Sequence, residues 1–188
     1  MTAGPPPGND PIDDWERDPD LRRMSLAFRA ELRGEAAAYE ALVAKDLARS
    51  RRLADVAQQL CSRGDVVEVT TATASFTGTV SLVRGDLASL TTPVGRVDLA
   101  LGSPLTLQVV ERVRRGGQQP RGGPASFRAR LAELEADATH VTVGTTLLHG
   151  DLEVTIDAVG VDHVVLTGTT GLRYVALAAV TFVLSPNR

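Results

Sequence analysis

The side chains that could catalyse a reaction or bind a metal ion are few and widely spaced. The chain has three histidines, His140, His149 and His163, and a single cysteine, Cys61. Two neighbouring pairs, His149 with Asp151 and Asp162 with His163, could each supply a general acid and a general base. However, no HxxxH, HExxH or Cys/His cluster provides the ligand spacing that a metal site requires. The sequence therefore predicts no catalytic residue, no metal site and no cofactor, and the protein is predicted not to be an enzyme.

Arginines gather in two stretches that could bind phosphate. They are Arg49, Arg52, Arg63, Arg112, Arg114, Arg115 and Arg121. Together they could form one basic strip that holds a nucleic-acid backbone without reading its base sequence. Alternatively, these arginines are the ordinary polar side chains of a solvated linker. The acidic segment 10–20 could also fold over the strip as a mimic of nucleic acid. The net charge of -3 predicts no general attraction to nucleic acid.

Composition indicates a cytoplasmic protein. No run of about 18 apolar residues is present, which predicts that no segment spans a membrane. The first 20 residues are acidic and rich in proline, unlike the basic and then apolar start of an export signal. Cys61 cannot form an internal disulfide, which fits a reducing compartment, and we interpret it as a small buried hydrophobic residue.

The first third of the chain is predicted to be a tail followed by helix. Residues 1–14 hold prolines, glycines and acids with little to bury, which is typical of a disordered tail. Over residues 15–63, apolar residues recur mostly at steps of three and four, which predicts one long amphipathic helix or two helices joined near Gly34. Such a helix is longer than a small β unit can cover. We therefore expect its apolar stripe to bind a second copy of the chain or a protein partner.

The rest of the chain is predicted to form two β-rich units. Short β-branched runs separated by Gly- and Pro-containing turns fill residues 64–112, and five strands in about 45 residues suggest a compact barrel. Residues 113–124 contain glycines, prolines and arginines and are predicted to be a linker. Residues 125–188 are predicted to contain a short helix and a second β-barrel.

The two β units match each other along the sequence. At an offset of 76 positions and without gaps, Asp86 aligns with Asp162 and Gly95 with Gly171. The helices that precede them share Arg-Leu-Ala, at Arg52 and Arg130, with an offset of 78. An ungapped register through both turns indicates an internal duplication, although any two β meanders of similar composition can align somewhere. The sequence leaves open whether the two barrels pair edge strands with each other.

The order of a helix and five strands, with an Asp-containing turn between the second and third strands, resembles the Sm-like fold. The resemblance is carried by residues 154–183, above all by the turn at Asp162 and His163 and by Gly171, and by Asp86 and Gly95 in the first copy. Together with the predicted helices and the internal repeat, it implies a mainly β protein with α elements, in which a long N-terminal helix precedes two tandem small five-stranded β-barrels, with a short helix before the second. The family's RNA pocket has Asn after the turn Asp and a later Arg-Gly or His-containing loop. In this sequence the position after the turn Asp holds Leu87 in the first copy and His163 in the second. The later position holds Leu-Ala-Leu in the first copy and Val-Ala-Leu in the second.

Because the family's RNA-binding groups are mostly missing, the shared fold does not carry over its ligand. We therefore expect a non-catalytic interaction or scaffold protein, with regulation as a further possible role, which associates with itself or with a protein partner through its helix. The alternative is a regulator that binds RNA through the arginine strip.

Overall fold

A computed structural model describes residues 19–113, 116–117, 120 and 122–186, and the chain divides into two compact units, 1–50 and 51–188. In the first unit, helix α2 (Pro19–Ser50) carries Asp20 in its first turn and Arg49 in its last, the order of charge that the helix dipole favours. None of the residues of α2 is buried.

The predicted helix over residues 15–63 is interrupted, but not at Gly34. A second helix, α3 (Leu53–Arg63), begins after the break at residues 51–52. Arg52 has extended backbone, with φ −81° and ψ 158°, and its N–H donates to Asp55 Oδ2 at 2.8 Å, which starts a new helix. Gly34 lies inside α2, where a single glycine costs only about 1 kcal/mol relative to alanine.

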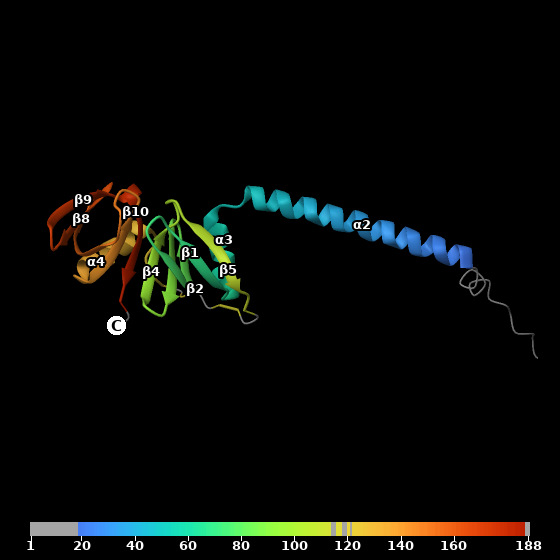
Figure 1. The fold of residues 1–188 in the computed structure, drawn as a ribbon, viewed down its shortest axis with the longest axis horizontal. Coiled ribbons are helices and arrows are strands. Elements are labelled where there is room, and N and C mark those ends of the chain that lie inside the picture. The colour runs from blue at the N-terminus through green and yellow to red at the C-terminus, as the bar shows by residue number, and fades with distance from the viewer. Residues whose placement is uncertain (1–18, 114–115, 118–119, 121, 187–188) are drawn as a thin grey trace, which may run out of the picture. The chain divides into compact units, whose positions relative to one another are not determined.

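The second unit contains one antiparallel sheet of ten strands, in the order β5-β1-β2-β3-β4-β10-β6-β7-β8-β9 (Figure 1). The strands are β1 (Val66–Thr70), β2 (Ser75–Arg84), β3 (Leu87–Thr92), β4 (Gly95–Ala100), β5 (Thr106–Glu111), β6 (His140–Thr145), β7 (Leu152–Val159), β8 (His163–Gly168), β9 (Gly171–Ala176) and β10 (Val180–Ser185). Helix α4 (Phe127–Ala136) precedes β6, as the sequence predicts, and a 3-10 turn (Leu177–Ala179) precedes β10.

The prediction of two closed five-stranded barrels is wrong. Strand β4 of the first repeat pairs with β10 of the second, with Leu99 opposite Phe182 and Arg96 opposite Ser185. A closed barrel needs its own edge strands to pair with each other, whereas here β4 is occupied by a strand from the other repeat. The ten strands therefore form one open sheet, and its outer edges within the described residues are β5 and β9.

The two halves of the sheet repeat the same strand order and register. The pairing of β2 with β3 is irregular between Val80 and Leu82, and that of β7 with β8 is irregular between Ile156 and Ala158, 76 positions later. The N–H of Leu101 donates to the Asp86 carbonyl oxygen at 2.7 Å, and that of Leu177 to the Asp162 carbonyl oxygen at 2.8 Å, with the same separation. The offset read from the sequence is thus present in the fold.

The helices that lead into the two halves correspond at an offset of 74 rather than 78. Gly64 and Ala138, just after α3 and α4, both take positive φ, 72° and 47°. Next to them, Asp65 N–H donates to the Leu60 carbonyl and Thr139 N–H to the Leu134 carbonyl. When the two helices are aligned at the offset of 74, the Arg-Leu-Ala sequences that start at Arg52 and Arg130 lie one helical turn apart. They match in sequence because apolar residues recur at each turn of a helix.

The two repeats share their hydrophobic core. The cluster that contains most buried residues of the first repeat also contains Phe182 of β10, and the cluster of the second repeat contains Leu82, Leu87 and Ala100 of the first. Helix α3 packs on β2, and α4 packs on β7 and also on β4. Since each half completes the core of the other, the repeats are not separate globular domains.

Candidate functional site

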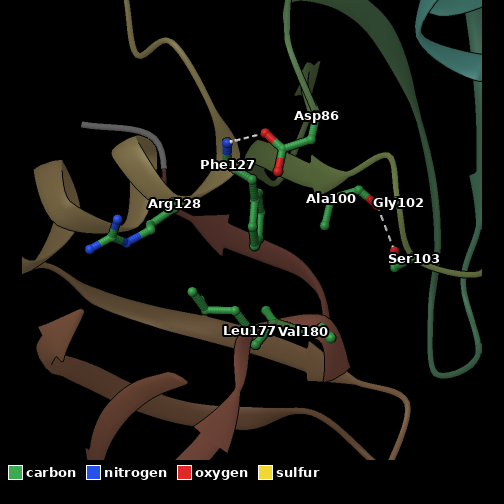
Figure 2. A pocket seen from close by; sticks show the side chains of 9 residues that line it. Asp86, Ala100, Gly102, Ser103, Phe127, Arg128, Leu177 and Val180 are labelled. Carbon is green, nitrogen blue, oxygen red and sulfur yellow. Dashed lines mark hydrogen bonds between the residues drawn. The ribbon is translucent and has the colours of Figure 1, made fainter. Parts of the chain in front are cut away.

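One pocket of the second unit lies where the two repeats meet. It encloses about 300 Å³ between the β2–β3 turn, the segment after β4, the first turn of α4 and the segment after β9 (Figure 2). Its lining consists of Asp86, Ala100, Gly102, Ser103, Phe127, Arg128, Leu177, Ala178 and Val180.

One wall of the pocket is formed by a contact between the turn of the first repeat and α4 of the second. Gly85 takes φ 57°, which lets the β2–β3 turn present the Asp86 carboxylate. Asp86 Oδ1 accepts the N–H of Phe127 at 2.8 Å, and Ser126 Oγ accepts that of Ala129 at 3.1 Å. These oxygens satisfy amide groups that the start of a helix leaves free, and the charge of Asp86 suits that end of the helix.

The remaining walls are mostly apolar. Figure 2 shows the Phe127 ring extending toward Leu177 and Val180, while the Arg128 side chain runs away from them. Arg128 Nε donates to the Gly160 carbonyl oxygen at 2.9 Å, and Ser103 Oγ donates to the Ala100 carbonyl oxygen at 2.6 Å. The apolar walls leave room for a small apolar group. The described residues that line the pocket include neither histidine nor cysteine, so they offer no nucleophile with an adjacent base.

A buried ion-pair network joins β4 to α4. The Asp98 side chain is 0% exposed and contacts Arg130 Nε at 2.7 Å, Arg96 Nε at 2.9 Å and Ser89 Oγ at 2.5 Å. Burial alone would lower the pKa of Arg130, but the charge and hydrogen bond of Asp98, with those of Glu133, outweigh it and raise this pKa above its ordinary value. Arg130 therefore stays charged, and its contact with Asp98 ties the two repeats together.

The equivalent turns have different surroundings in the two repeats. Whereas Asp86 binds α4, Asp162 contacts His163 Nδ1 at 2.9 Å, and this hydrogen bond lowers the pKa of the Asp162 carboxyl. A Cβ at Gly95 would lie 2.2 Å from the Ser185 carbonyl oxygen of β10, so the close approach of β4 and β10 requires glycine there. Gly171, at the equivalent place on the outer edge, has open space around it.

The structure places four of the seven predicted arginines. Arg49 lies in α2, where it contacts Asp46 at 3.5 Å, and Arg52 precedes α3. Arg63 ends α3, and Arg112 follows β5 near the same point, because Val113 N–H donates to Asp65 Oδ1 at 3.1 Å. Arg114, Arg115 and Arg121 lie outside the described residues, as does the predicted tail at 1–14.

The described residues contain no group of three or more His, Cys, Asp or Glu side chains that could hold a metal ion. His140 contacts Glu153 at 3.5 Å on the surface. Cys61 is buried, and burial raises the pKa of its thiol, which disfavours the reactive thiolate. In the part of the chain with a described structure, no helix has both the length and the apolar character needed to cross a membrane.

Sequence reasoning missed the Asp98 network. One signal was present, because Asp98 stands between the apolar Val97 and Leu99 in a strand, and a buried carboxylate requires a partner. Nothing in the sequence pointed to Arg130, which lies 32 positions further along. Comparisons of the chain with protein-family models, with curated proteins and with solved structures give no match.

Proposed function

We propose that the protein is a non-catalytic cytoplasmic scaffold that associates with itself through α2. The observation that carries this proposal is that α2 has no buried residue although it bears many large apolar side chains. The exposed ones are Leu21, Met24, Leu26, Phe28, Leu32, Tyr39, Leu42, Val43 and Leu47. Monomeric proteins rarely expose so much contiguous apolar surface unless it serves an interaction.

Most of these apolar residues share one face of the helix. Leu21, Met24, Phe28, Leu32, Tyr39, Val43 and Leu47 follow one another at steps of three, four or seven, and Ala36 fills the longer step. At 100° per residue this spacing places them in a single stripe that runs the length of α2. Leu26 lies on the other side of the helix. A stripe of this kind packs against a partner helix.

The charges of α2 favour a second copy of the chain, in antiparallel orientation, as the partner. The first half of the helix has more bases than acids, with Arg22, Arg23, Arg29 and Arg33 against Asp20 and Glu31. The second half has more acids than bases, with Glu35, Glu40 and Asp46 against Lys45 and Arg49. Antiparallel pairing of two copies places each basic half beside an acidic half.

Replacing Leu32 with Glu is expected to break this pairing. Leu32 is exposed, so the substitution leaves the monomer folded, but in the pair it places a charge inside an apolar contact. Loss of a two-fold contact reduces the mass of any assembly by about a factor of two. Light scattering on the full chain, at several concentrations, measures that mass.

Leu26→Glu is the matched control, because it introduces the same charge at another exposed leucine, on the other side of α2. It should leave the mass unchanged. A wild-type chain that is monomeric at all concentrations, or a Leu32→Glu chain with the wild-type mass, would overturn the proposal.

RNA binding is the second candidate. It is favoured because Arg63 ends α3, and the N–H of Val113, next to Arg112, donates to Asp65 Oδ1, two residues beyond Arg63. If this pair contacts phosphate, Arg63→Ala with Arg112→Ala should weaken single-stranded RNA binding and reduce the salt slope of log K by about 1.4. Arg173→Ala is the control, because Arg173 lies in β9, in the other repeat, and donates to Thr170 Oγ1 in the turn before that strand. Fluorescence anisotropy across salt measures the slope, and absence of binding at about 50 mM salt would end this candidate. The resemblance to Sm-like proteins stays a prediction.

A further inference from the structure

The apolar stripe of α2 has the same spacing in both directions along the helix. Six of its large side chains follow one another at steps of four, four, seven, four and four, and all six are exposed. Reversing the helix about the point between Glu35 and Ala36 exchanges Met24 with Leu47, Phe28 with Val43, and Leu32 with Tyr39. A contact between two identical surfaces related by a two-fold axis requires such a pattern, because each residue must meet the one that the reversal selects.

We propose that two copies of α2 pair antiparallel in this register, with the two-fold axis between Glu35 and Ala36. Phe28 of each copy then lies opposite Val43 of the other, and Leu32 lies opposite Tyr39. Of the large apolar residues of the stripe, Leu21 alone has no apolar counterpart, because it falls opposite Ser50. The register rests on the proposed function, self-association through α2, and specifies which residues make the contact.

One side of the stripe carries charges that complement each other in this register. Arg29, Arg33 and Glu40 follow at steps of four and seven, so they lie along the same side of α2. Two antiparallel helices related by a two-fold axis meet with the same sides together. The reversal places Glu40 midway between Arg29 and Arg33 of the other copy. Each Glu40 therefore has two arginines of the other copy at about 3 Å along the helix axis, one in either direction.

The structure already holds these two arginines together. Arg33 Nε donates to the Arg29 carbonyl oxygen at 3.0 Å, which directs the Arg33 side chain along the helix toward Arg29. A shallow hollow on the surface of α2 is lined by Arg29, Leu32 and Arg33. In the proposed register this hollow faces Tyr39 and Glu40 of the other copy. An apolar ring then meets the leucine, and a carboxylate meets the two guanidinium groups.

A parallel pair would bring different charges together. Glu31 and Glu35 lie on the other side of the stripe from Arg29 and Arg33. Opposite sides meet in a parallel pair, so Arg29 would approach Glu31, and Arg33 would approach Glu35. In the antiparallel register, Glu35 of one copy instead repels Glu35 of the other beside the axis, and Glu31 meets no charged side chain. The three glutamates of α2 therefore distinguish the two orientations.

Replacing each glutamate by glutamine tests the register without changing the apolar stripe. Glu40→Gln should weaken the dimer about tenfold, because it removes two exposed ion pairs from each of two symmetric contacts. Glu35→Gln should strengthen the dimer about twofold, because it removes a repulsion. Glu31→Gln is the matched control and should leave the dissociation constant unchanged. Sedimentation equilibrium of the full chain at about 50 mM salt measures these constants, and screening should shrink the differences at about 0.5 M.

The three substitutions have little effect on the free helix. None of these glutamates has a basic residue three or four positions away in α2, so no ion pair within the helix is lost. Glutamate and glutamine also have similar helix propensities. A change in the dissociation constant therefore reports on the contact between copies.

Disulfide trapping between two different chains tests the same register directly. One chain carries Phe28→Cys and the other Val43→Cys, and both carry Cys61→Ala, so that the introduced thiols are the only ones. Packed helix axes lie about 8–10 Å apart and Cα atoms about 2.3 Å from each axis, so facing residues come within disulfide range. Mild oxidation of a tagged with an untagged chain should give a mixed dimer on a non-reducing gel.

Two controls accompany the trapping. Phe28→Cys mixed with Tyr39→Cys displaces the thiols by four residues, about 6 Å, and should give at least about fivefold less mixed dimer. Phe28→Cys oxidised alone should give little dimer, because the two thiols lie about 22 Å apart along the antiparallel pair, whereas in a parallel pair they face each other. Circular dichroism confirms that each variant is folded.

The register would be overturned by a disulfide between two Phe28→Cys chains, by equal trapping in and out of register, or by weakening of the dimer in Glu31→Gln or Glu35→Gln. Absence of trapping in chains that sediment as dimers would overturn it as well. If the wild-type chain dimerises and Leu32→Glu separates it, these results leave self-association through α2 in place. A wild-type chain that is monomeric at all concentrations overturns both. Where a cysteine substitution itself separates the chains before oxidation, the glutamine series decides.

Discussion

Replacing Asp98 with alanine is expected to lower the free energy of unfolding by about 3–5 kcal/mol. The Asp98 carboxylate is 0% exposed, and Arg130, which is 13% exposed, donates to it at 2.7 Å. Removing the carboxylate leaves the Arg130 guanidinium in a poorly solvated site, with Glu133 as its remaining acid partner. Ser89 Oγ also loses its acceptor. Urea denaturation followed by circular dichroism measures the change.

Three further variants separate the buried charge of Arg130 from the more exposed charge of Arg96 and from the cavity that the substitution creates. Arg96→Ala removes a partner that is 38% exposed, and should cost about 1 kcal/mol or less. Asp98→Leu combined with Arg130→Met replaces the buried pair by apolar side chains of similar size, and should recover most of the loss. If Asp98→Leu alone were as stable as the double variant, the unpaired Arg130 charge would not be the cause.

Truncating Phe182 to alanine is expected to destabilise the second unit by about 3–5 kcal/mol, and to loosen the first repeat although Phe182 belongs to the second. Its ring is fully buried among residues of the first repeat, and it packs edge to face on Phe76 with ring centroids 4.8 Å apart. The ring also lies over Gly144, where an added Cβ would come within 2.0 Å of it. Hydrogen exchange should show loss of protection in β1 and β2 as well as in β10.

Tyr174→Ala is the control for Phe182→Ala, because it removes an exposed aromatic ring from the same repeat. In a monomeric sample it should change stability by no more than about 0.5 kcal/mol. If Phe182→Ala left protection in β1 and β2 unchanged while β10 lost it, the two repeats would unfold separately and the shared core would not couple them.

Part of the candidate site could be predicted from sequence. Asp86 and Gly95 stand out because they recur at Asp162 and Gly171, and both glycines take positive φ in the structure. What could not be predicted is that Asp86 binds the N–H of Phe127, 41 positions away. A turn is specified by its own few residues, whereas the partner of a carboxylate depends on how distant segments pack.

The local elements and their repetition could be read from neighbouring residues. Alternating apolar residues defined the strands, Gly and Pro defined the turns, and the offset of 76 recurs in the strand register. The pairing of β4 with β10, the open sheet and the burial of Asp98 against Arg130 became visible only in the folded chain. The reason is physical: turn and strand preferences are set by adjacent residues, but every strand edge offers the same backbone groups. The partner of an edge is therefore chosen by the core that the pairing completes, here by Phe182 entering the first repeat.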